Sequence, residues 1–174
     1  MEVTELEHRE AGMPEIATPE RCEVAIVYFD KPSRDRAIHL CDTLLQRFKD
    51  DLDFHFTWWN VRYLTDSHIA HLASEAIINS DLIVFAAGEN AELSPGVKKR
   101  LERWMRKRQG REGALAVYLE APSDAAQQNP LDAYARGVAA RAHLDYVAAP
   151  EPDTRRDPTF DQFRFPTSHW GINE

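Results

Sequence analysis

The runs EVAIVYF (residues 23–29) and DLIVFAA (residues 81–87) are apolar along almost their whole length, and a polar turn and a helix start follow each of them. A strand that is buried on both faces has this continuous pattern, and its alternation with helices is typical of a parallel α/β sheet. In such a sheet, ligand sites lie in the turns that follow the strands. The two runs therefore predict the fold class and the place where a site would lie.

Strand-like and helix-like periods alternate along the rest of the chain. Residues 53–59 (DFHFTWW) alternate, so that Trp58 and Trp59 should point to opposite sides and pack in the core. This pattern is typical of a strand with one less buried face, which favours the edge of a sheet. The other expected elements are strands at 114–120 and 144–148 and helices at about 34–49, 66–79, 95–109 and 130–142.

Helix-start signals support these helices. Ser33 stands at an N-cap position, and Ser94-Pro95 and Asn129-Pro130 each combine a cap residue with a proline in the first turn. Gly110 is expected to stop the third helix. Five strands alternating with four helices, with the less buried strand second, predict an α/β three-layer sandwich. Its five-stranded parallel sheet should have the flavodoxin-like order 2-1-3-4-5.

The composition predicts one domain between two tails. The chain has 174 residues, of which 43% are hydrophobic, so it can bury a sizeable core but is short for two domains. We expect an acidic tail at 1–21, the α/β domain at 22–149 and a proline-rich, then aromatic tail at 150–174. The two cysteines, Cys22 and Cys41, should be core thiols, because they form neither a disulfide framework nor a metal-binding motif.

Charge and hydropathy argue against membranes and nucleic acids as partners. No apolar run approaches the roughly 20 residues that cross a bilayer, and the acidic start has none of the features of a signal peptide. We therefore expect a cytoplasmic protein without membrane contact. The net charge of −8 argues against nucleic acid as a partner, because phosphate contacts need a positive surface.

A candidate ligand site lies in the turns after the first and third strands, where the sheet order reverses. Its residues are Asp30, Ser33 and Arg34 in one turn and Gly88, Glu89 and Asn90 in the other. Two carboxylates could hold a cation or share acid and base roles, while Arg34 and free helix amides could hold a small anionic ligand. Alternatively, Ser33 is a cap, Gly88 a turn residue and the carboxylates are solvated. We assign no catalytic residue, metal site or cofactor.

The layout of residues 22–149 resembles the flavodoxin-like superfold, which includes flavodoxins and bacterial receiver domains. Flavodoxins have a loop of small residues after the first strand, whereas this chain has DKPSRDR (residues 30–36). Receivers have a phosphorylated aspartate at the end of the third strand, whereas this chain has Ala86 and Ala87. We therefore expect the chain to belong to a family of unknown function. We also expect that the protein retains no flavin and performs no receiver-type phosphotransfer.

A second resemblance concerns residues 79–102 (NSDLIVFAAGENAELSPGVKKRLE), whose layout is similar to that of nucleoside deoxyribosyltransferases and TIR domains. That resemblance implies a catalytic glutamate at Glu102. The helical phase of Glu102, off the apolar face, instead favours a surface ion pair with Lys98 or Arg106. His68, His71 and Glu75 share a polar helix side without a clear further metal ligand.

Two further features suggest interaction surfaces, although the first, a basic stretch, could equally be a solvated face that is balanced by the chain's own glutamate-rich N-terminus. Between residues 98 and 111 the chain has eight cations and one acid, and the four tail aromatics are Phe160, Phe163, Phe165 and Trp170. The candidate interaction residues are Lys99, Arg103, Arg106, Phe163 and Trp170. We interpret the chain as a non-enzymatic interaction or regulatory module that binds a protein partner or a second copy. The alternative is a small enzyme or sensor that binds a phosphorylated or nucleoside-like ligand between the first and third strands.

Overall fold

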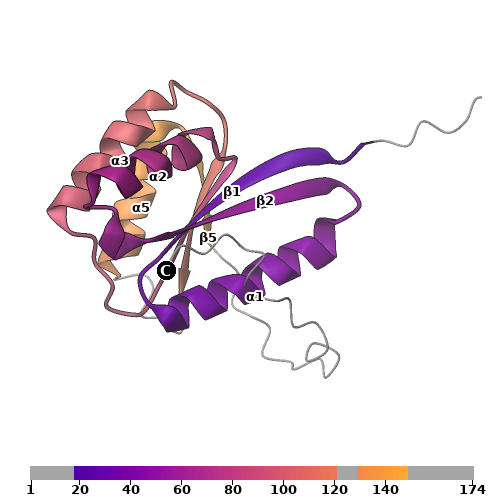
Figure 1. Cartoon of the computed structure of the whole chain (residues 1–174), viewed down its shortest axis with the longest axis horizontal. Coiled ribbons are helices and arrows are strands. Elements are labelled where there is room, and N and C mark those ends of the chain that lie inside the picture. Colours follow the sequence, from indigo (N-terminus) through magenta and orange to yellow (C-terminus); the bar gives the residue numbers. More distant parts are fainter. Residues whose placement is uncertain (1–17, 121–128, 149–174) are drawn as a thin grey trace, which may run out of the picture.

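Five parallel strands form one sheet in the order β2-β1-β3-β4-β5 (Figure 1). The computed structural model describes residues 18–120 and 129–148. The strands are β1 (Glu20–Tyr28), β2 (Leu52–Asn60), β3 (Leu82–Ala87), β4 (Ala114–Leu119) and β5 (Asp145–Ala148). The expected order is confirmed: β1 and β3, the two apolar runs, are inner strands, and the alternating β2 is an edge strand.

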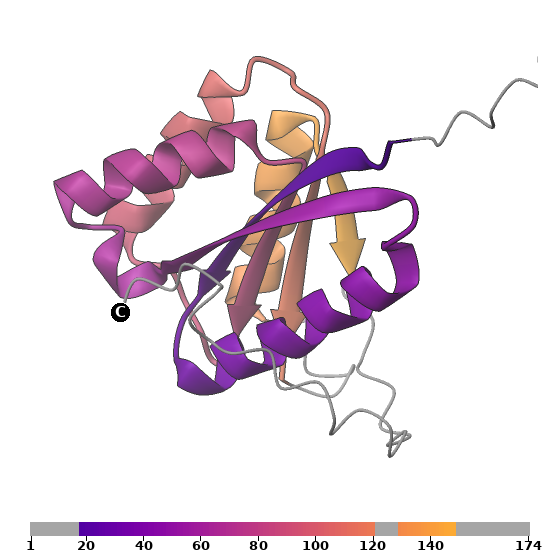
Figure 2. The same cartoon turned by 45° about the vertical axis from the view of Figure 1, so that its right-hand side comes forward.

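Helices cover both faces of the sheet. They are α1 (Lys31–Phe48), α2 (Ser67–Asn79), α3 (Pro95–Lys107) and α5 (Pro130–Ala142), and the short 3-10 helix η1 (Val61–Tyr63) follows β2. The helix α1 lies on one face and the other three lie on the opposite face (Figures 1 and 2). Right-handed crossovers explain this division, because the chain steps one way from β1 to β2 and the other way afterwards. None of the helices in the described ranges is long and apolar enough to cross a membrane.

The core has one layer on each face of the sheet. Along β1, Val24 and Ile26 pack towards α1, while Ala25 and Val27 pack on the side of α2, α3 and α5. The tryptophans of β2 divide in the same way. Trp58 is buried on the α1 side, and Trp59 packs partly buried against the other layer. The expected core packing is therefore confirmed for Trp58, whereas Trp59 lies partly buried at the margin of the other layer.

The first helix begins earlier than expected, because its N-cap is Asp30 and not Ser33. The Asp30 carboxylate accepts a hydrogen bond from the Ser33 backbone N–H at 2.8 Å, and Ser33 Oγ accepts one from the Asp30 N–H at 3.0 Å. This reciprocal pair is a capping box. Pro32 lies inside the first turn, where the missing N–H has no helical partner to lose. The other expected caps, Ser94 and Asn129, are confirmed.

The third helix ends at Lys107, ahead of Gly110, and the next residue is a buried cation. The Arg108 residue is 4% exposed. Its Nη1 donates to the carbonyls of Ile77, Ile78 and Ser80 at 2.8, 3.1 and 2.9 Å, and its Nη2 donates to Glu112 at 3.1 Å. Arg108 therefore binds carbonyls at the end of α2, which α2 leaves without helical partners. Burial lowers the pKa of the guanidinium, but its charge is kept because arginine is not deprotonated in proteins.

Two half-buried tyrosines of the α3–α5 side make stability depend on pH. Burial raises the pKa of Tyr134 to about 12. Burial, followed by a hydrogen bond from its hydroxyl to Asp132, also raises the pKa of Tyr146. Both phenols stay protonated in the folded protein above pH 10, where unfolded tyrosines begin to ionise. The stability from these two groups is complete below about pH 10 and is lost as the pH rises towards the folded pKa values.

We therefore expect the free energy of unfolding to fall as the pH rises from about 10 to 12, as measured by urea denaturation. The variant Tyr134→Phe/Tyr146→Phe isolates the contribution of the two phenols from that of lysines. It should lose stability less steeply over this range than the wild-type chain. Equal slopes for the two proteins would contradict the assignment.

Candidate functional site

In the turn after β1, where a ligand was expected, Asp30 and Ser33 are hydrogen-bonded to each other. Asp30 and Ser33 form the capping box of α1, and Ser33 is fully buried. Burial alone would raise the pKa of Asp30, but hydrogen bonds from Ser33 and the charge of Arg36 lower it overall. The carboxylate is therefore ionised and bound to the helix start. Both residues have a structural role in capping α1, although the N-cap is Asp30 and its carboxylate is hydrogen-bonded to Ser33.

Arg36, which was not among the candidates, crosses from α1 to the ends of β3 and β4. Its Nη2 donates to the Ala87 carbonyl at 3.1 Å, and its Nη1 lies 3.3 Å from the Glu120 carboxylate. The guanidinium thus lies where the sheet order reverses. One sequence signal could have identified it: Arg36 lies one turn after Ser33 and beside Ala37, both buried, so it starts from the sheet side of α1.

The turn after β3 is separate from this arrangement. Glu89 and Asn90 are exposed, and the Glu89 carbonyl accepts a hydrogen bond from the Asn129 side chain. Space is open around Gly88. Within the described residues, neither Glu89 nor Asn90 forms a hydrogen bond or ion pair with the side chains of Asp30 or Ser33. The six candidates therefore lie at one end of the sheet without converging on one point.

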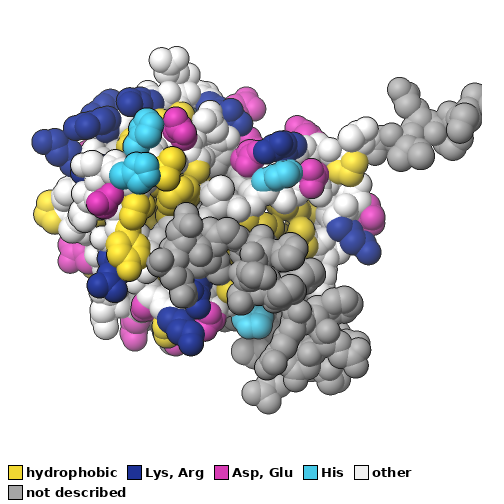
Figure 3. All heavy atoms as spheres, in the orientation of Figure 1, with side chains coloured by type: hydrophobic (Ala, Val, Ile, Leu, Met, Phe, Trp, Pro, Cys, Tyr) yellow, Lys and Arg dark blue, Asp and Glu magenta, His cyan; other side chains and the backbone are white. Residues whose placement is uncertain are grey.

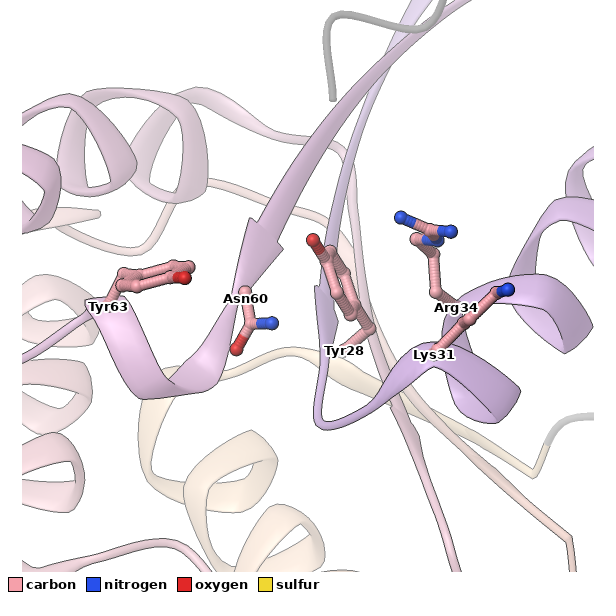
Figure 4. Close-up of a pocket in the computed structure, with 5 residues that line it drawn as sticks. All are labelled: Tyr28, Lys31, Arg34, Asn60 and Tyr63. Carbon is pink, nitrogen blue, oxygen red and sulfur yellow. The ribbon is translucent and has the colours of Figure 1, made fainter. Parts of the chain in front are cut away.

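A pocket of about 320 Å³ lies one strand away, between the carboxyl ends of β1 and β2 (Figure 4). We call it the β1–β2 pocket, and its lining residues are Tyr28, Lys31, Arg34, Asn60 and Tyr63. Tyr28 and Asn60 are the last residues of their strands, Lys31 and Arg34 belong to the start of α1, and Tyr63 ends η1. Of the six expected ligand residues, Arg34 is the one that lines this pocket.

Among the residues that the structure describes, the lining of the β1–β2 pocket carries two cations and no carboxylate. Lys31 is exposed, while the side chain of Arg34 is half-buried, with its Nε 3.6 Å from the carboxylate of Asp35 outside the lining. Asn60 caps η1 by accepting the Arg62 backbone N–H on its Oδ1 at 3.0 Å. Its amide nitrogen is on the side of Tyr28 (Figure 4). The pocket therefore presents hydrogen-bond donors of positive or neutral charge.

The cations between residues 98 and 111 divide into two groups. Four have structural partners: Arg108 binds backbone carbonyls, Lys98 pairs with Glu92 at 3.4 Å, Arg100 donates to the Thr65 carbonyl at 3.1 Å, and Arg111 pairs with Asp81 at 3.0 Å. The other four are exposed, and they form no ion pair or side-chain hydrogen bond within the described ranges. These are Lys99, Arg103, Arg106 and Lys107, which we call the basic face of α3. Dark blue side chains gather over this helix in Figure 3.

The prediction that Glu102 pairs with a cation of its own helix is wrong. The carboxylate lies 3.6 Å from Nη2 of Arg141 on α5, so it does not pair with Lys98 or Arg106 on its own helix. The cause is tertiary: α5 packs beside α3 and brings a cation to Glu102 from outside the helix.

The histidines of α2 and the cysteines form no larger cluster. His68 is exposed, and His71 lies 3.7 Å from Glu75 on the exposed side of the helix. Among the residues that the structure describes, no group of three or more His, Cys, Asp or Glu side chains is placed to hold a metal ion. Cys41 is buried as expected and Cys22 is half-buried; burial raises the pKa of both thiols.

The aromatic residues expected to form a second interaction surface, Phe160, Phe163, Phe165 and Trp170, lie outside the described residues, as does most of the acidic N-terminal tail. Comparison of the chain with known protein families, with curated proteins and with solved structures gave no match. The class that can be stated is therefore that of the fold, an α/β three-layer sandwich with a flavodoxin-like strand order.

Proposed function

We propose that the protein is a non-enzymatic interaction module of the cytoplasm, and that the basic face of α3 binds an acidic segment of a partner protein. The observation that supports this proposal is the group of four exposed cations without a carboxylate partner in the described ranges, in a chain whose net charge is −8. Cations gathered on one helix of an acidic protein create a dipolar surface that steers a negative partner to that helix.

The spacing of the four cations suits an extended acidic segment. Arg103, Arg106 and Lys107 follow Lys99 at positions that share one side of α3, over about 12 Å of helix length. An exposed ion pair contributes roughly 0.2–1 kcal/mol, so four pairs give weak binding that added salt weakens further. This side of the helix has no interleaved aromatic residues on which bases could stack, which favours a peptide over a single-stranded nucleic acid.

The reversal point between β1 and β3 supports the enzyme alternative less well. A catalytic site there would need free titratable groups within hydrogen-bond reach of one another. Asp30 and Ser33 bind each other, and Arg36 binds the Ala87 carbonyl and Glu120. A chemical step would have to displace these contacts. The arrangement therefore favours an interaction module over an enzyme.

The proposal is tested by charge reversal on α3. We expect Arg103→Glu/Arg106→Glu to weaken binding of a fluorescein-labelled ten-residue polyglutamate peptide about tenfold at low salt, equivalent to about 1.4 kcal/mol. The matched control is Arg47→Glu/Lys49→Glu, which makes the same charge change at the far end of α1. Fluorescence anisotropy at two salt concentrations measures both affinities.

Equal weakening by the control and the α3 variant would show that net charge alone determines binding, and would overturn the assignment to α3. Tighter binding of a single-stranded DNA oligonucleotide than of the peptide would overturn the choice of a protein partner.

A further inference from the structure

The β1–β2 pocket is lined by a buried tyrosine whose hydroxyl group has no partner in the described ranges. Tyr28 is 4% exposed, and it lines the pocket with its ring and hydroxyl (Figure 4). No hydrogen bond joins this hydroxyl to any other residue of the described ranges, and Tyr28 is not one of the residues with a further contact. The Tyr28 hydroxyl oxygen is open to the pocket, because it is not one of the fully buried side-chain atoms that lack a partner. It can therefore donate a hydrogen bond to a polar occupant.

The polar groups around Tyr28 define the charge of that occupant. Lys31 and Arg34 supply N–H donors and no acceptor. The Oδ1 of Asn60 already accepts the Arg62 N–H, so the amide can offer its NH₂ group to the pocket. The Tyr28 hydroxyl can also donate into the pocket. The described lining residues supply donors with two positive charges and no carboxylate, which is complementary to an oxyanion.

The mouth and the volume of the pocket indicate which organic group the anion carries. Tyr63 is 38% exposed, with the Arg62 guanidinium 5.4 Å from its ring centroid. An exposed aromatic ring at a pocket mouth can stack on a flat organic group. The volume of about 320 Å³ is at the lower end of the range for ligand sites, which suits one ring and one anionic group but not a dinucleotide.

From these observations we propose that the β1–β2 pocket binds a small phosphate monoester that carries a single planar ring. Lys31, Arg34, Asn60 and the Tyr28 hydroxyl bind the phosphate oxygens, and the ring lies against Tyr63. The site is at the carboxyl ends of two parallel strands, where α/β proteins bind ligands, but it lies between β1 and β2 and not at the reversal point between β1 and β3. It is separate from the basic face of α3, so the two proposals can fail independently.

Phenyl phosphate is the probe, with binding to the full chain measured by isothermal titration calorimetry. We expect Tyr28→Phe, which removes one hydroxyl that no described residue binds, to weaken the affinity about tenfold, the usual effect of losing a hydrogen bond to a charged group. Lys31→Gln should weaken it by a similar factor. Tyr118→Phe, at a buried tyrosine outside the pocket, and Lys49→Gln, at the other end of α1, are the matched controls and should leave the affinity unchanged.

Three further probes separate the parts of the ligand. Inorganic phosphate should bind more weakly than phenyl phosphate, benzoate should bind more weakly because it carries a single negative charge, and phenol should not bind measurably. Thermal melting of each variant without ligand confirms that it is folded. Absence of binding by phenyl phosphate, or equal affinities of the Tyr28→Phe and Lys31→Gln variants and the wild-type chain, would overturn the site. Equal binding of inorganic phosphate would overturn the role of Tyr63.

Discussion

Replacing Arg108 with methionine should lower the free energy of unfolding by about 3 kcal/mol, because several buried carbonyls lose a charged donor at once. Methionine keeps much of the length of the side chain but offers no N–H group. The carbonyls of Ile77 and Ser80 would then lie inside the protein without a partner. Urea denaturation followed by circular dichroism measures the change, and thermal melting should show a clear decrease in Tm.

The matched control for this substitution is Arg111→Met, three residues further along. Arg111 is about half exposed and pairs with Asp81 at the surface, so its loss should cost less than about 1 kcal/mol. If both variants lost the same stability, the connection between α2 and the end of α3 would not depend on the buried guanidinium.

Replacing Gly113 with alanine should cost about 2 kcal/mol, the middle of the usual range for forcing extra volume into a packed site. A Cβ atom at this position would lie 2.7 Å from Nη2 of Arg108 and 2.8 Å from the carbonyl oxygen of Asp81. The arginine can shift, but the carbonyl belongs to the backbone that precedes β3. Most of the cost should therefore remain in an Arg108→Met background, as measured by urea denaturation of the four proteins of the double-mutant cycle.

Gly96→Ala provides the control for this second prediction. Gly96 lies in the first turn of α3, and a Cβ atom added there would have nothing within 4 Å. Alanine at this position should therefore leave stability unchanged or raise it by up to about 1 kcal/mol. A Gly113→Ala variant as stable as the wild-type chain would show that the backbone before β3 can move aside.

The fold could be predicted from the sequence because the pattern of apolar residues in a strand indicates how many of its faces are buried. A continuous apolar run such as residues 82–87 indicates an inner strand, and the alternation of Phe54, Phe56 and Trp58 with polar neighbours indicates an edge. The role of Arg108 could not be predicted in this way, because the carbonyls that it binds are about 30 residues earlier in the chain. In the sequence it is one of eight similar cations.

The candidate site was predicted less completely than the fold. The end of the sheet and Arg34 could be deduced from strand order and turn composition. Tyr28 and Asn60, in contrast, are read as the ends of strands, and Tyr63 as part of a loop. They meet because the parallel register of β1 and β2 places Tyr28 opposite Asn60, with the start of α1 and η1 following the two strands. This long-range pairing has no local sequence signal. Residues such as Tyr28 and Asn60, which end strands and also line the pocket, could therefore be identified only from the structure.

The central position of β1 has a consequence for how the chain is made. Its pairing with β2 can form once residue 60 has been synthesised, but the edge that pairs with β3 stays open until residue 87. At roughly 5–20 residues per second, this interval lasts a few seconds. During that time, the apolar residues from Val24 to Tyr28 present an unpaired strand edge on the ribosome, where other nascent chains or a chaperone can bind it.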